Sequence, residues 1–244
     1  MQKLVLQQNK TPQTTSTIRL TFNMPDIDEL LPTLKEGDFA ILYGSQTVTS
    51  LLSQLCVRAH LPAEQGGIES KTVFIDAAKS STLYNITQTA ELQQLDPQEI
   101  REQIQPFRAY TAYRLHFLIM EQLEQIIKTV NVKLVAISNI MYPFLTENID
   151  DQEAKMAYNQ IMNYLSNFAK KHNIIIVATN LPSENDIRNS MLQEITTAKA
   201  NIILRHTKTP YTSEIELEKH PSYMLGVMDF NYENKTLTDF CFKN

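Results

Sequence analysis

The residues whose types and spacing could do chemistry stand between an apolar stretch and a helical pattern near the start of the chain. Phe39–Tyr43 has the composition of a short buried strand, and the apolar residues from Leu51 to Val57 recur at helical spacing. The segment Gly44-Ser45-Gln46-Thr47-Val48-Thr49-Ser50 connects the two. A strand, a glycine-led turn and a helix in this order are the context in which backbone N–H groups hold a phosphate. The sequence therefore places a candidate phosphate-binding loop at this junction.

This loop departs from the pattern that phosphate chemistry needs. The motif G-x-x-x-x-G-K-[ST] supplies a second glycine, so that the backbone can close around phosphate, and a lysine that neutralises its charge. Here the segment is short, and Thr47 and Val48 stand in place of that glycine and lysine. Thr49 is the one residue of the segment that could serve as the metal-binding hydroxyl. We therefore expect the structural context of a phosphate site without most of its chemistry.

Composition and charge argue against several classes of function. The chain has 244 residues, a formal net charge of −5 and only 5 glycines, which disfavours strong non-specific binding to nucleic-acid backbones. No apolar run approaches the roughly 18 residues of a membrane span, and Met1–Leu6 lacks the core of a signal peptide. We expect a cytoplasmic protein with no membrane partner. No His/Cys cluster suggests a metal, and of the two cysteines, Cys56 and Cys241, the first is predicted to be a buried free thiol.

Strands and helices alternate along most of the chain. The apolar run Ile174–Thr179 is typical of a parallel sheet that is covered on both faces. Two short helices are expected to begin at capping residues, one over Ile27–Leu34 after Asp26 and one after Asp96. The other expected elements are strands at Phe39–Tyr43, Lys71–Asp76, Ile104–Arg108 and Lys133–Ser138, and helices at about 48–60, about 82–92, Tyr113–Lys128 and Asp151–Lys171.

The last third of the chain changes character. Asn201–Arg205, Ser213–Glu218, Tyr223–Phe230 and Thr236–Phe242 are predicted to be short strands, and we expect them to be antiparallel. Residues 1–17 are polar and are interpreted as an arm or linker, and residues 18–244 as a single core domain. The predicted fold class is α/β, with a mostly parallel central sheet flanked by helices and a C-terminal antiparallel extension.

Several short segments carry a resemblance to a known family. Leu61–Gly67 (LPAEQGG) is similar to an L-P-x-E-x-G-G connection, and Val73–Asp76 (VFID) to a Y-I-D strand. Further matches are Leu95–Ile100 (LDPQEI) with Phe107–Tyr110 (FRAY), Lys133–Ser138 (KLVAIS) and Ile176–Asn180 (IVATN). In this order and spacing, over roughly residues 17 to 232, the chain resembles the core domain of the RecA-like recombinases, in particular archaeal RadA and its eukaryotic relatives. The resemblance implies a RecA-like P-loop NTPase core.

The departures from that family fall on its catalytic positions. Val48 stands at the position of the Walker A lysine and Ala78 at that of the glutamate that activates water. Ser138 replaces the Walker B aspartate, and Leu181, after Asn180, replaces the glutamine that senses the γ-phosphate. These groups hold Mg²⁺ and phosphates in the family. We therefore expect a pseudo-ATPase that needs no cofactor, with binding of ATP and Mg²⁺ as the less favoured alternative.

Other residues are open to two interpretations. Met141, Tyr142 and Phe144 could pack in the core or bind a partner. Lys199, Arg205, His206 and Lys208 could be solvated charges or contacts to DNA or a partner. Arg58, Lys71 and Lys79 could be surface charges or residual phosphate contacts, and Arg108 could pair with carboxylates or face a neighbouring subunit. Asp76, at the end of a strand and close to Ala78, is interpreted as a turn cap.

Three functions follow from these observations. The first is a non-catalytic RadA paralog that acts as an accessory (mediator) factor in homologous recombination and DNA repair. It would bind a RadA-type recombinase or another RecA-family paralog, with single-stranded DNA as a further partner. The second is an ATP-binding protein that receives catalytic groups in trans, for which Thr49 and Arg108 would matter. The third is a stand-alone DNA-binding repair factor, which would be nucleoid-associated.

Overall fold

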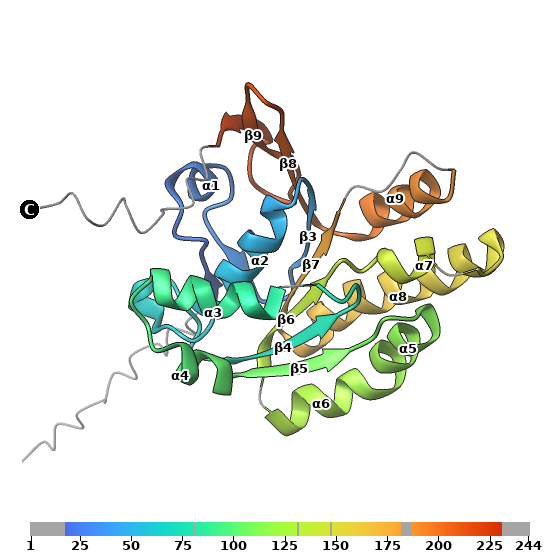
Figure 1. The fold of residues 1–244 in the computed structure, drawn as a ribbon, viewed down its shortest axis with the longest axis horizontal. Helices are drawn as coiled ribbons and strands as arrows, with labels where there is room; N and C mark the ends of the chain where they lie inside the picture. The colour runs from blue at the N-terminus through green and yellow to red at the C-terminus, as the bar shows by residue number, and fades with distance from the viewer. Residues whose placement is uncertain (1–17, 81, 131, 147, 182–186, 231–244) are drawn as a thin grey trace, which may run out of the picture.

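The structure is a computed structural model that describes residues 18–80, 82–130, 132–146, 148–181 and 187–230 (Figure 1). The predicted arm at residues 1–17 and the predicted strand Thr236–Phe242 lie outside the described residues. Within the ranges that are described, no helix is long and apolar enough to cross a membrane.

An eight-stranded sheet forms the centre of the fold, in the order β10-β9-β8-β3-β7-β6-β4-β5 (Figure 1). β3 to β8 run parallel to their neighbours in this order, and β9 and β10 return antiparallel. The predicted mostly parallel sheet with an antiparallel extension is confirmed, although the β8 strand, expected to be antiparallel, pairs parallel with β3 and antiparallel only with β9. The strands are β3 (Phe39–Gly44), β4 (Lys71–Asp76), β5 (Ile104–Arg108), β6 (Val132–Ser138), β7 (Ile175–Asn180), β8 (Ile202–Lys208), β9 (Ser213–Lys219) and β10 (Gly226–Asp229). A separate two-stranded sheet joins β1 (Arg19–Leu20) to β2 (Leu34–Lys35).

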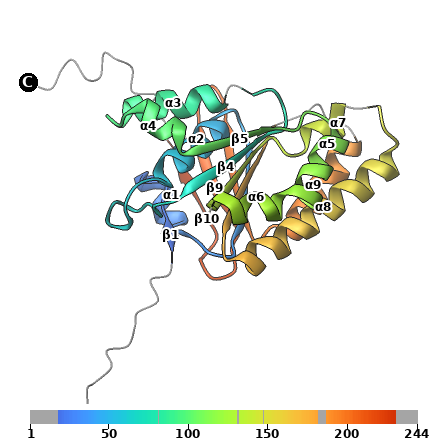
Figure 2. The same cartoon turned by 90° about the horizontal axis from the view of Figure 1, so that it is seen from below.

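Helices cover both faces of the large sheet, as Figure 2 shows from below. Side chains of β3 alternate between two apolar cores, with Phe39 and Ile41 in one and Ala40 and Leu42 in the other. Because both cores exclude water, the parallel strands are apolar throughout, which is the pattern that the sequence displays. One face carries α1 (Pro25–Leu30), α2 (Thr47–Arg58), α3 (Thr82–Leu92) and α4 (Pro97–Glu102). The other carries α5 (Ala112–Phe117), α6 (Leu123–Val130), α7 (Tyr142–Thr146), α8 (Asp151–His172) and α9 (Ile187–Lys199).

The predicted helix Tyr113–Lys128 contains a π-helical turn at Leu118–Gln122, between α5 and α6. Four buried residues of this stretch, Leu115, Ile119, Leu123 and Ile127, are spaced four apart. In a regular α-helix that spacing drifts by about 40° per step around the axis. The wider π turn reduces this drift, so the apolar stripe stays on the sheet.

One of the two predicted helix caps is wrong. Asp96 caps α4 as predicted, through its side chain. α1, however, begins at Pro25 with Met24 as its N-cap, so Asp26 lies inside the first turn. A proline suits the first helical position, and it starts the helix before the aspartate. Asp28 instead accepts a hydrogen bond from the Met24 N–H at 2.9 Å.

Arg58 is neither a surface charge nor a phosphate contact, so both interpretations of it were wrong. It is only 3% exposed at the end of α2. Its guanidinium donates to the Thr21 carbonyl oxygen at 2.9 Å and also to the Gln65 carbonyl oxygen. Asp28 is the carboxylate whose charge acts on it. Arg58 therefore connects α2 to the segment before α1 and to the loop that follows α2.

Replacing Arg58 by Gln is expected to lower the free energy of unfolding by about 2–4 kcal/mol, because buried carbonyl groups lose their donors. Urea denaturation followed by circular dichroism measures this change through the transition midpoint. The exposed Arg101, replaced by Gln, is the matched control and should shift the midpoint little. Equal midpoints for both variants would show that the buried contacts contribute nothing.

Candidate functional site

The junction between β3 and α2 is the place where the sequence predicts phosphate chemistry. Gly44 ends the strand and Thr47 begins the helix, which leaves only Ser45 and Gln46 between them. The first backbone donors of α2 are already bonded within the turn: Thr47 N–H to Ser45 Oγ at 3.2 Å, and Val48 N–H to the Ser45 carbonyl oxygen at 3.1 Å. The Thr49 N–H donates to the Gln46 carbonyl oxygen at 3.1 Å. These are the donors that an anion at a helix N-terminus requires.

Thr49 does not present its hydroxyl to a metal ion at this junction. Its Oγ1 donates to the Gln46 carbonyl oxygen at 2.7 Å, and the residue is 8% exposed. Val48, at the lysine position, is buried in the core between α2 and the sheet. The residues present therefore do not fit a nucleotide phosphate and its Mg²⁺ at this end of α2. In the described part of the chain, no group of three His, Cys, Asp or Glu side chains could hold a metal ion.

A buried histidine from β8 holds the turn in place. Ser45 Oγ lies 2.6 Å from His206 Nδ1, and His206 Nε2 lies 3.1 Å from Ser213 Oγ. The Ser45 N–H also donates to the His206 carbonyl oxygen at 2.9 Å. His206 is 2% exposed and meets the Phe230 ring edge-on. The interpretation of His206 as a DNA or partner contact is therefore wrong, because the imidazole connects the two-residue turn to β8 and β9.

Gly44 makes this close approach possible. Its φ is +109°, a conformation that residues with a Cβ rarely adopt, and an added Cβ would stand 2.1 Å from the His206 carbonyl oxygen. A side chain at this position would push the turn away from β8. The glycine that opens the predicted loop is thus required by backbone packing between neighbouring strands.

A hydroxyl network fills the position of the Walker B carboxylate. Ser138, at the end of β6, is fully buried, and its Oγ lies 3.0 Å from Ser80 Oγ and 3.2 Å from Thr82 Oγ1. Asp76 Oδ1 accepts hydrogen bonds from the Ala78 N–H at 3.2 Å and the Ser80 N–H at 3.1 Å. The prediction that Asp76 caps a turn is confirmed. Ala78, at the glutamate position, contributes only its backbone to this network.

The ends of β6 and β7 are joined by side-chain amides. Asn139 Oδ1 accepts from the Leu181 N–H at 3.2 Å, and Asn180 Oδ1 accepts from the Met141 N–H at 3.3 Å. The sensor positions Asn180 and Leu181 therefore lie in a connection between two strand ends. Asn139 has a φ of +53°, which asparagine tolerates better than most residues.

The loop after β6 is mostly core. Met141 is 2% exposed and Phe144 is fully buried, so the interpretation of these two as partner or DNA contacts is wrong. Phe144 packs edge-on against the Tyr158 ring of α8 at 5.3 Å. Tyr142 is 40% exposed and is the member of this cluster that a partner could reach.

The basic residues near β8 do not form one surface. Lys199 ends α9 and lies at the opposite end of β8 from Lys208. The Arg205 guanidinium pairs with Glu216 and, at 3.0 Å, with Glu218, so its charge is balanced within the sheet. Of these basic residues, Lys208 is the one that lies at the carboxyl end of β8.

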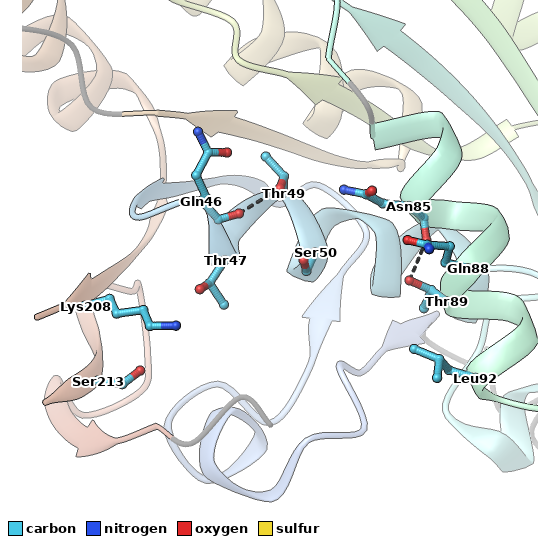
Figure 3. Close-up of a pocket in the computed structure, with 10 residues that line it drawn as sticks. All are labelled: Gln46, Thr47, Thr49, Ser50, Asn85, Gln88, Thr89, Leu92, Lys208 and Ser213. Carbon is cyan, nitrogen blue, oxygen red and sulfur yellow. Dashed lines mark hydrogen bonds between the residues drawn. The ribbon is translucent and has the colours of Figure 1, made fainter. Parts of the chain in front are cut away.

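A cleft of about 440 Å³ lies between α2, α3 and the β8–β9 turn (Figure 3). Sequence reasoning identified the residues on α2 and Lys208, but it missed those on α3, whose only signal is the polar run from Asn85 to Thr89. Neutral amides and hydroxyls make up most of the lining, and Lys208 is the one cation that the described residues contribute to it. The lining residues are Gln46, Thr47, Thr49, Ser50, Asn85, Gln88, Thr89, Leu92, Lys208 and Ser213. This lining suits a neutral or weakly anionic polar group better than a triphosphate.

The strand order with β3 at its centre, and a strand–turn–helix junction at the carboxyl edge, define a RecA-like α/β core. A family model described as Rad51 matches residues 13–210, and the chain belongs to the Rad51 family. The DNA repair and recombination protein RadA of Aeropyrum pernix is 27% identical over 168 residues, which cover 66% of this chain and 52% of that protein. The chain thus spans about half the length of this curated relative.

The stability of the fold is expected to fall as the pH drops below about 6.5, in part through His206. Burial lowers the pKa of His206, and the charge of Lys208 acts in the same direction. Unfolded histidine takes up a proton near pH 6.5, whereas the buried imidazole stays neutral to lower pH, so acid favours the unfolded chain. Each such histidine contributes a slope of up to about 1.4 kcal/mol per pH unit. Burial also lowers the pKa of His60, to about 4, in the same sense.

Urea denaturation at several pH values between about 4 and 7.5 measures this slope. Replacing His206 by Gln should flatten the slope, whereas replacing Ser213 by Ala, which keeps the imidazole, should leave it steep. Parallel curves for the original chain and the His206→Gln variant would rule out a neutral His206 in the fold.

Proposed function

We propose that this chain is a non-catalytic member of the Rad51 family that acts through protein contacts in homologous recombination and DNA repair. Its partner would be a RadA-type recombinase or a second paralog, with single-stranded DNA bound alongside. The observation that carries the proposal is that the first backbone donors of α2 are bonded within the turn formed by Ser45 and Gln46. Because these donors are already used, the scaffold is poorly suited to binding a nucleotide phosphate, and the exposed apolar side chains described below favour a protein partner.

The energetics of the junction support this proposal. To receive a phosphate, the Thr47, Val48 and Thr49 N–H groups would each have to break a hydrogen bond that contributes about 1 kcal/mol. No lysine at position 48 would compensate by pairing with the incoming charge. Catalytic groups supplied in trans would not remove this obstacle, because it lies within the turn itself.

The exposed apolar side chains indicate where a partner would bind. Tyr113, Tyr142, Met156 and Ile187 are 79%, 40%, 62% and 86% exposed. They stand on α5, α7, α8 and α9, which lie together on one side of the sheet (Figure 1). Arg188 fixes this arrangement, because it pairs with Asp151 of α8 at 2.6 Å. We assign the partner contact to this surface, which includes Tyr142 from the sequence prediction.

Mg-ATP should not stabilise the isolated chain. A ligand present at roughly 100 times its Kd raises the free energy of unfolding by about 2.7 kcal/mol, which is a shift of several degrees in Tm. A thermal-shift titration with Mg-ATP is therefore expected to leave Tm unchanged, while a catalytically active RadA in the same buffer should show a rise. A rise of several degrees for this chain would refute the non-catalytic proposal and favour the nucleotide-binding alternative.

Changing the apolar surface should weaken partner binding without unfolding the chain. In biolayer interferometry against a RadA-type recombinase of the same cells, Tyr142→Ser together with Ile187→Ser is expected to reduce affinity about 10-fold or more. Tyr211→Ser, at a residue that is 95% exposed near the β8–β9 turn, is the control and should keep full affinity. Failure of the unmodified chain to bind any recombinase or paralog would argue against the proposed function as a whole. Equal affinities of both variants would reject only this surface.

A further inference from the structure

A second cleft lies at the amino-terminal end of the parallel strands, away from the β3–α2 junction. It has a volume of about 360 Å³ and is bordered by the ends of α8, α9 and β9. Three of its lining residues are lysines from three different elements: Lys170 of α8, Lys199 of α9 and Lys219 of β9. Ser166 and His220 line it as well, and in the part of the chain that the structure describes no acidic residue lines it. Segments distant in sequence thus bring like charges together.

Part of this charge has a structural task. Lys219 Nζ donates to the carbonyl oxygen of Thr197 at 2.7 Å and lies 3.4 Å from that of Ala198, at the last turn of α9. Lys170 likewise stands in the last turn of α8. Cations at helix C-termini offset the negative end of the helix dipole. The blander explanation of the cluster is therefore that it neutralises two helix ends.

The three lysines carry more positive charge than the two helix C-termini can balance. Each helix C-terminus carries about −0.5 elementary charge, so two of them balance about one ammonium group. Three ammonium groups are present, and among the described residues none of Lys170, Lys199 and Lys219 forms an ion pair with a carboxylate. This leaves an excess of about two positive charges, which the Asp38 carboxylate beside the cleft reduces to about one. A protein of net charge −5 concentrates this excess in one concave place.

His220, which lines the cleft, is held in a defined tautomer and ring orientation. Its Nδ1 accepts hydrogen bonds from the Ser222 N–H at 3.0 Å and the Tyr223 N–H at 2.8 Å, so the proton of the neutral ring is on Nε2. Stacking on the Tyr223 ring at 4.0 Å fixes the imidazole plane. The neighbouring carboxylate, Asp38, already accepts hydrogen bonds from the Asn201 amide at 2.9 Å and the Lys35 N–H at 2.7 Å.

We propose that this cleft binds a phosphate group, with Lys170 and Lys199 supplying the charge and His220 an N–H donor. Ammonium groups, an imidazole N–H and the Ser166 hydroxyl are donors that suit a tetrahedral oxyanion, and the absence of carboxylates from the lining avoids repulsion. The phosphate could belong to the backbone of single-stranded DNA or to a small phosphorylated molecule. This site is separate from the partner surface and from the cleft of Figure 3.

The test uses the full chain and two double variants of equal charge change. Lys170→Gln with Lys199→Gln removes two positive charges and keeps Lys219, which donates to a carbonyl group of α9, whereas Arg101→Gln with Lys155→Gln removes exposed cations of α4 and α8 elsewhere. Binding of a fluorescein-labelled oligothymidine is measured by anisotropy at several salt concentrations. Inorganic phosphate is titrated in parallel, with Tm as the readout and potassium chloride as the ionic-strength control.

We expect the Lys170/Lys199 variant to bind the oligonucleotide at least about 10-fold more weakly. Its plot of log affinity against log salt should lose about 1.4 in slope, since each phosphate contact to a single strand accounts for about 0.7. If instead phosphate alone raises Tm in the original chain but not in this variant, and the oligonucleotide does not bind, the ligand is a small phosphorylated molecule. Either result supports the site.

Three results would overturn the proposal. The first is that neither probe binds the original chain, and the second is that the Arg101/Lys155 control loses as much affinity as the Lys170/Lys199 variant. A lower Tm of the Lys170/Lys199 variant without ligand, combined with unchanged binding, would also overturn it. The lysines would then serve only to neutralise the two helix ends.

Discussion

The close approach of the Gly44 backbone to the His206 carbonyl group is the constraint on which the carboxyl edge of the sheet depends. It lets β3 turn into α2 after only two residues, because Ser45 bonds to His206 through both its N–H and its hydroxyl. A turn this short leaves no room for successive N–H groups to surround an anion. The same contact that stabilises the junction thus determines what the junction can bind.

Most of the other polar groups at this edge satisfy one another, although the buried Asn180 Nδ2 has no hydrogen-bond partner among the described residues. Ser138 shares its hydroxyl with Ser80 and Thr82, and Asp76 is bonded to backbone N–H groups of its own turn. A buried polar group without a partner costs about 1–3 kcal/mol, so a site built to receive a ligand is a stability burden when empty. Internal pairing removes that burden. The hydroxyl and carboxylate groups of Ser138, Ser80, Thr82 and Asp76 are therefore hydrogen-bonded without any ligand.

The strands and long helices could be predicted from sequence because apolar runs and helical periodicity report burial directly. The predicted bounds of β4 and β5 match the structure to the residue and those of α3 approximately, whereas the predicted start of α1 is wrong because Pro25 begins the helix before Asp26. Burial of polar side chains was beyond the sequence. Nothing local distinguishes Arg58 or His206 from surface residues, since Arg58 bonds to Thr21, 37 residues away, and His206 to Ser45, 161 residues away. Lys199 and Lys208 are close in sequence but not in space. The strand β8 runs between them and places them at opposite ends of the sheet.

One edge of the sheet, the strand β5, constrains how a partner can bind. Just outside the two ends of this strand, the Gln103 carbonyl and the Ala109 N–H both point to β4. Because backbone groups alternate in direction along a strand, Pro106 must turn its nitrogen outward, where a strand-adding partner would need a donor. A proline at that position removes the central N–H of a short edge and disfavours strand addition. A partner that binds the exposed side chains of α5, α7, α8 and α9 does not need the N–H that Pro106 lacks, because it forms no backbone hydrogen bonds with a sheet edge.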